Sequence, residues 1–107
     1  MFKMVAEVKN NLDKIIETCR QMQVKSLYLF GSGARSDDFS GGSDIDFLYS
    51  MITNNEGLPA GNYDYFDLLW KLEEITGRKV DLVPEKGIRN KYLLKSILED
   101  RIKLYEA

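Results

Sequence analysis

Apolar residues recur at steps of three and four along the first part of the chain, and this spacing puts them on one face of a helix. They are Val5, Val8, Leu12, Ile15, Ile16 and Cys19. The pattern predicts an amphipathic helix over roughly residues 3–22. Cys19 lies on the apolar stripe, so we expect it to be a buried core thiol rather than a reactive one.

Short β-prone runs predict the strands. VKSLYLFG (24–31) ends in glycine, DIDFLYSM (44–51) begins with alternating polar and apolar residues, and RKVDLVP (78–84) stops at Pro84. IKLYE (102–106) predicts a short edge strand. Between the first two runs we expect one helical turn over 32–37 and a loop over 38–43, and TNNEGLPAG (53–61) has the composition of a second loop.

Two further helices follow from capping signals and periodicity. Asn62 can cap a helix over about 63–76, and Gly77 can end it. A last helix fits residues 90–100. The predicted inward faces are Phe66, Leu69, Leu72 and Ile75 in the first of these helices and Leu93, Leu94, Ile97 and Leu98 in the second. Trp70 is interpreted as core or as a partner surface.

The predicted order is α-β-turn-β-α-β-α-β. The link between the first two strands is too short to require a crossover, so those strands can be antiparallel. We therefore expect an α/β (α+β) fold with a small mixed sheet and packed helices, formed by one domain over residues 1–107.

The composition narrows the chemistry. Fifteen basic and seventeen acidic residues give a net charge of −2, which argues against polymeric nucleic acid as the partner. No apolar run approaches ~18 residues, so no membrane span is predicted, and the single cysteine fits a cytoplasmic protein. There is no histidine, so a metal site would use carboxylates, which favours magnesium or manganese over zinc.

Asp44 and Asp46 point to the same side of the second predicted strand. Their carboxylates can approach to about 5 Å, where two charges repel by about 3 kcal/mol at an effective dielectric constant of 20. A pair at a solvated strand start would tolerate this repulsion, whereas a divalent ion would reverse its sign. Asp81 lies inside the third apolar strand. Three adjacent strand carboxylates would form a magnesium site suited to two-metal phosphoryl chemistry.

Gly31 and Ser32 end the first predicted strand. Glycine lets the backbone approach a ligand closely, and the N–H groups of the following turn can bind phosphate oxygens. An ordinary exit from a strand would look the same. The segment lacks the Gly-Lys-Ser/Thr of a P-loop, and a Rossmann turn would need glycine where Ser36 stands.

LFGSGAR, the later SDIDFL and the still later VDLV together resemble the minimal nucleotidyltransferase (MNT) family of the DNA polymerase β-like superfamily. The similarity runs from about Val24 to Leu104. It implies a mixed-sheet α/β fold and an enzyme that transfers a nucleoside monophosphate from a nucleoside triphosphate. The spacer between the two motifs, 33–43, is one residue longer than is common in the family, and the extra residue falls in the predicted loop.

The resemblance also assigns roles to residues. The nucleotide-binding positions map onto Gly31 and Ser32, and the metal-binding and catalytic carboxylates onto Asp44, Asp46 and Asp81. Arg35 matches the GSxAR pattern of the family, as a phosphate contact or as a salt-bridge partner of Asp37 or Asp38.

The resemblance implies ATP as the nucleotide, two magnesium ions with manganese as the alternative, and a HEPN-domain toxin as the partner. On this interpretation the protein is an antitoxin that adenylylates the toxin. The alternatives are an antitoxin that acts by contact alone and an enzyme that modifies a small molecule.

Overall fold

The computed structural model describes residues 4–31, 34, 44–60 and 64–107. A four-stranded sheet forms its centre, in the order β3-β2-β1-β4. β1 is antiparallel to both β2 and β4, whereas β2 and β3 are parallel. The strands are β1 (Val24–Phe30), β2 (Ile45–Met51), β3 (Val80–Pro84) and β4 (Ile102–Glu106). This mixed sheet confirms the predicted fold class, the antiparallel pairing of the first two strands and the edge position of the last.

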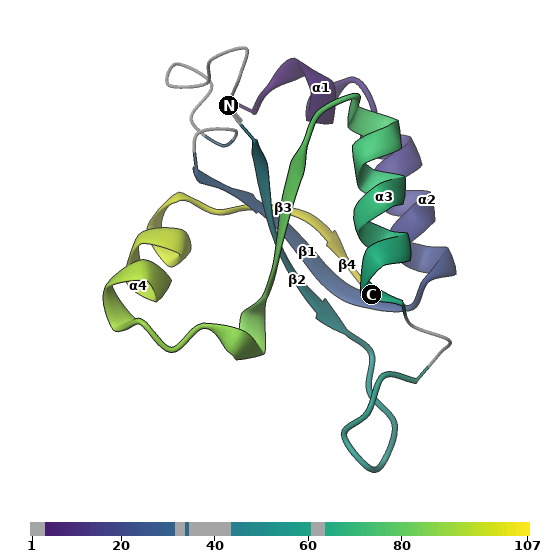
Figure 1. Ribbon diagram of the computed structural model, residues 1–107, viewed down its shortest axis with the longest axis vertical. Coiled ribbons are helices and arrows are strands. Elements are labelled where there is room, and N and C mark those ends of the chain that lie inside the picture. Colours follow the sequence, from purple (N-terminus) through teal and green to yellow (C-terminus); the bar gives the residue numbers. More distant parts are fainter. Residues whose placement is uncertain (1–3, 32–33, 35–43, 61–63) are drawn as a thin grey trace.

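Helices lie on both faces of the sheet (Figure 1). On one face are α2 (Leu12–Gln21) and α3 (Tyr65–Thr76), with the short α1 (Ala6–Lys9) next to α2. On the other face lies α4 (Lys91–Asp100), which is preceded by a 3₁₀ turn, Glu85–Gly87. Within the described part of the chain, no helix is long and apolar enough to cross a membrane.

The larger core lies between the sheet and the helices α2 and α3. Its fully buried side chains include Leu27, Leu29, Phe47, Leu68 and Leu72, and each contributes about 1.5–3 kcal/mol by leaving water. Cys19 is fully buried in this core, as predicted. Burial raises the pKa of its thiol to about 12, so the group stays protonated and behaves as a small apolar side chain.

A smaller core lies under α4. It consists of Phe30, Leu48 and Ile97, with the partly buried Tyr28, Val83 and Ile88 packed against it. Because α4 brings only one fully buried side chain, Ile97, to this face, the sheet here is covered far less completely than on the other side.

The predicted N-terminal helix is two helices, so the continuous span 3–22 was wrong. Asn11 explains the break between α1 and α2. Its side-chain Nδ2 donates to the Glu7 carbonyl at 2.7 Å, the acceptor that its own backbone N–H would use in a continuous helix. That backbone N–H donates to the Val8 carbonyl instead.

The start of α3 also differs from the prediction. Asp64 is the N-cap, and its carboxylate accepts hydrogen bonds from the backbone N–H groups of Phe66 and Asp67. Asn62, the predicted cap, lies outside the described residues. Gly77 ends α3 in the left-handed region, as predicted, with φ +69°. Phe66 is 56% exposed, so its assignment to the inward face was wrong. Trp70 is 62% exposed, which rules out the core and leaves the other predicted role, a partner surface, as a prediction.

The predicted inward face of α4 was too wide. Asn90 caps the helix by accepting from the backbone of Tyr92 and Leu93. Ile97 is buried, but Leu93 and Leu98 are about half exposed because α4 rests only on the smaller core. The predicted turn over 32–37 and loop over 38–43 fall almost entirely outside the described residues.

Candidate active site

Two of the three predicted carboxylates lie side by side in the sheet. The parallel register of β2 and β3 pairs Asp46 with Asp81, and neighbouring strands are about 4.8 Å apart. Alternate residues of a strand share a face, so Asp46 lies on the face of Leu48 and Asp81 on the face of Val83. Leu48 and Val83 belong to the smaller core. The pair therefore lies on the thinly covered face of the sheet, beyond the edge of that core.

Asp44 completes the group. It precedes β2 by one residue and is exposed. Half-buried Asp46 has its pKa raised from 3.8 to about 6, first by burial and then by the charges of Asp81 and Asp44. The structure thus brings the three predicted residues into electrostatic contact, because the two neighbouring charges act on the carboxylate of the third.

Asp81 lies in an apolar strand, as predicted, but it is exposed even though its neighbours in the sequence are apolar. β3 is an edge strand, and Asp81 is its second residue. The Tyr65 hydroxyl donates to the Leu82 carbonyl at 2.9 Å. This bond ties α3 to β3 one residue beyond Asp81 and helps to hold the strand against Asp46.

The donor set fits a divalent cation, although no three His, Cys, Asp or Glu side chains among the described residues are already arranged to hold a metal ion. Oxygen ligands suit magnesium and manganese. Without a cation, holding Asp46 ionised in this group is unfavourable, because burial and then repulsion raise its pKa. A bound cation would remove that cost. The two exposed carboxylates, Asp44 and Asp81, leave the group open to solvent on one side.

Gly31 ends β1 beside this group. Phe30 pairs with Asp46 across β1 and β2, and Gly31 follows with φ +69°, in the left-handed region. A Cβ atom at this position would collide with Oδ2 of Asp46. The structure therefore gives a reason for glycine that the sequence did not suggest: position 31 must leave room for a carboxylate of the protein itself. Ser32 and Arg35, the other predicted nucleotide-binding residues, lie outside the described residues.

Arg101 is a residue on this face that the sequence analysis missed. Its guanidinium carbon lies 4.3 Å from the centroid of the Tyr28 ring. Arg101 directly follows α4, and no local pattern in the sequence distinguishes it from the other basic residues. Only the strand pairing shows that it lies near the aspartates.

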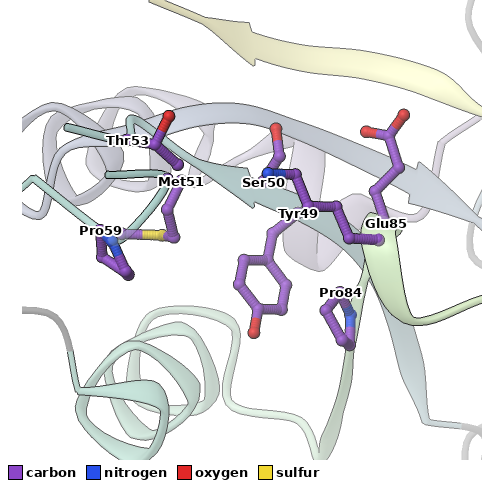
Figure 2. Close-up of a pocket in the computed structure, with 9 residues that line it drawn as sticks. Tyr49, Ser50, Met51, Thr53, Pro59, Pro84 and Glu85 are labelled. Carbon is purple, nitrogen blue, oxygen red and sulfur yellow. The ribbon is translucent and has the colours of Figure 1, made fainter. Parts of the chain in front are cut away.

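The structure also contains an apolar pocket of about 220 Å³ at the opposite end of β2 and β3. Figure 2 shows the Tyr49 ring between Pro59 and Pro84. Tyr49 is an odd number of residues from Asp46 and packs in the larger core, so its ring lies on the face of the sheet opposite to the aspartates. The lining residues are Tyr49, Ser50, Met51, Thr53, Gly57, Pro59, Pro84, Glu85 and Lys86.

The family model described as "Nucleotidyltransferase domain" matches residues 12–104, which include the whole sheet except the last two residues of β4. The chain belongs to this nucleotidyltransferase family. It is 41% identical, over 94% of its length and 97% of the relative's, to "Putative protein adenylyltransferase MJ1379" of Methanocaldococcus jannaschii. The family resemblance seen in the sequence is thereby confirmed, and the protein is a nucleotidyltransferase.

Solved structures share the nucleotidyltransferase fold. "Structure of putative minimal nucleotidyltransferase" is 26% identical with a TM-score of 0.70, over 89% of this chain and 90% of that one. "Crystal structure of the toxin-antitoxin with AMP-PNP" is 25% identical with a TM-score of 0.65, over 91% of this chain and 74% of that one. A third structure is of a tri-AMPylated Shewanella oneidensis HEPN toxin in complex with MNT antitoxin. It is 24% identical with a TM-score of 0.58, over 92% of this chain and 72% of that one, and it supports the fold alone.

Proposed function

We propose that this nucleotidyltransferase transfers AMP from ATP to a side-chain hydroxyl of a partner protein, and that the partner is a HEPN-domain toxin. The observation that carries the proposal is the meeting of Asp46 and Asp81 across β2 and β3, with Asp44 acting on the same carboxylate. Support for AMP and for a protein acceptor comes from the relative named as a protein adenylyltransferase and from the toxin–antitoxin structure with AMP-PNP.

The three carboxylates share the metal site in the proposal, and Asp81 has a second part. Asp44, Asp46 and Asp81 would hold two magnesium ions, or manganese, which neutralise charge on the α-phosphate and on the departing pyrophosphate. Asp81 is exposed and lies on an edge strand, where an incoming chain can reach it. We therefore propose that Asp81 takes the proton from the acceptor hydroxyl. The acceptor oxygen bonds to the α-phosphorus, the bond to the bridging oxygen breaks, the proton passes to Asp81, and pyrophosphate leaves.

The open site favours a protein as the acceptor. Asp44 and Asp81 are exposed, and a wet site weakens the electrostatic stabilisation of a transition state. A partner that covers this face would exclude water and deliver its hydroxyl in the same step. We place the reaction in the cytoplasm, in keeping with the single cysteine, which is a buried thiol rather than half of a disulfide.

The test begins by asking whether an adjacent reading frame encodes a HEPN-domain protein. Intact-mass spectrometry of that protein, mixed with this one, ATP and magnesium, would then test the proposal. We expect the partner to become heavier by one or more AMP units. The control is the double variant Asp44→Asn/Asp46→Asn, which should fold and leave the partner's mass unchanged. A tight complex without a mass change, equally protective with the double variant, would favour neutralisation by contact alone.

A further inference from the structure

We propose that Arg101 is a nucleotide-binding residue that contacts the β- and γ-phosphates of the triphosphate; this inference rests on the proposed function. The starting observation is the position of its side chain. The guanidinium carbon lies 4.3 Å from the centroid of the Tyr28 ring. The backbone is fixed as well, because the Arg101 N–H donates to the Ile97 carbonyl at the end of α4 and the next residue, Ile102, pairs with Leu29.

The strand register places Arg101 close to the aspartates. Asp46 pairs with Phe30, and Tyr28 is two residues before Phe30 on the same face of β1. Tyr28 is therefore the diagonal neighbour of Asp46, and such neighbours are about 7–8 Å apart. Tyr28 and Phe30 both belong to the smaller core, on the face that carries the aspartates. A long side chain above Tyr28 can reach a ligand that lies over Asp46.

The charge of Arg101 is available for a ligand. Considering only the residues that the structure describes, no carboxylate forms a salt bridge with Arg101; its recorded side-chain contact is the ring of Tyr28. Stacking occupies the flat face of a guanidinium and leaves the five N–H donors around its edge for other partners. These donors match the oxygens of a phosphate group, which they can bind in pairs.

The order of the strands indicates which phosphates are involved. Asp81 lies on β3 and Asp46 on β2, Gly31 ends β1, and Arg101 leads into β4. A triphosphate whose α-phosphate lies at the aspartates, with the acceptor on the side of Asp81, would extend across β1 toward β4. Arg101 would then stabilise the pyrophosphate as it leaves.

The competing interpretation is structural: Arg101 could simply hold the corner between α4 and β4 against Tyr28. The variant Arg101→Gln distinguishes phosphate binding from this structural role. Its affinities for ATP, inorganic tripolyphosphate and AMP are measured by calorimetric titration with magnesium, and the melting temperature of the free protein is measured as well. A direct contact predicts that the variant binds ATP and tripolyphosphate about 10- to 100-fold more weakly. AMP, which lacks the β- and γ-phosphates, should bind as it does to the wild type.

Arg20→Gln is the matched control, since it removes the same charge from an exposed residue of α2 on the other face of the sheet. Arg101→Met keeps an apolar stem over Tyr28 and repeats the test if the glutamine variant melts early. Arg101→Lys keeps the charge without the planar fork and should lose less affinity.

The outcomes distinguish this inference from the proposed function. Wild-type protein that does not bind ATP would refute both. Wild-type protein that binds ATP, with Arg101→Gln binding it equally well, would refute only the role of Arg101. If Arg101→Gln loses affinity for ATP and AMP equally and melts at a lower temperature, Arg101 has a structural role only. If Arg20→Gln loses as much affinity for ATP as Arg101→Gln does, the effect is one of net charge and the contact is refuted.

Discussion

Gly31→Ala is the most discriminating single substitution that the structure offers. The new Cβ would collide with Asp46 Oδ2 and would lie 3.4 Å from Cγ and 3.6 Å from Cβ of the same side chain. All three atoms belong to one short side chain, which can relieve the collision by rotating. We therefore expect most of the damage to fall on the position of the carboxylate and little of it on the fold.

Gly77→Ala is the matched control. Gly77 has the same φ of +69°, but a Cβ there would have nothing within 4 Å. Both substitutions force alanine into the left-handed region, which costs about 1–2 kcal/mol. Urea unfolding should therefore give similar losses in the free energy of unfolding for the two variants.

The two variants should differ in activity. Displacing a preorganised charged group costs about 10²–10³ in rate, so Gly31→Ala should lose nucleotide transfer by at least that factor, while Gly77→Ala keeps it. Reactions stopped at several times and analysed by intact-mass spectrometry would give the rates of AMP transfer. The reasoning fails if Gly31→Ala transfers AMP at the rate of Gly77→Ala, or if it unfolds while Gly77→Ala does not.

Three further predictions concern the aspartates. Asp44→Asn/Asp46→Asn should unfold at a urea concentration no lower than the wild type without divalent ions, because it removes repulsion; a lower midpoint would contradict the assignment. Asp81→Asn should bind ATP normally in calorimetry but turn over slower by several orders of magnitude, and near-normal turnover would show that Asp81 is structural. The pKa of Asp46 rises from 3.8 to about 6 on folding, so the folded protein retains a proton that the unfolded chain releases. In the absence of divalent ions the free energy of unfolding should therefore fall as the pH rises through this window, by about 1 kcal/mol once solvent screening of a half-buried group is allowed for. Urea titrations at several pH values would measure this fall, which Asp46→Asn should abolish.

Much of the fold could be predicted because the signals were local. The strand runs and the glycine that ends α3 both depend on a few adjacent residues. The errors arose where tertiary packing decides exposure. Phe66, Leu93 and Leu98 have helical spacing, but the smaller core is too narrow for both leucines of α4, and Phe66 lies outside the surface that α3 buries.

The candidate site divides in the same way. Asp44 and Asp46 could be paired from the spacing of a strand, and Asp81 was added from its position inside a third apolar strand and from its match to a family motif. The collision that requires glycine at position 31 depends on a cross-strand register, as does the approach of Arg101. No pattern within one segment contains either, because each involves residues that are far apart in the sequence.

The parallel pairing of β2 with β3 also constrains how the protein folds. Asp46 and Asp81 are 35 positions apart, and they become neighbours only after α3 has crossed over the sheet. The antiparallel β1–β2 pair, in contrast, is separated by only the 14 residues 31–44, and contacts between residues farther apart in the sequence form more slowly. The β1–β2 pair can therefore form early, whereas the repulsion between Asp46 and Asp81 arises only as the crossover is completed. The pairing of Asp46 with Asp81 thus places an electrostatic barrier at the end of folding, which a nascent chain meets last.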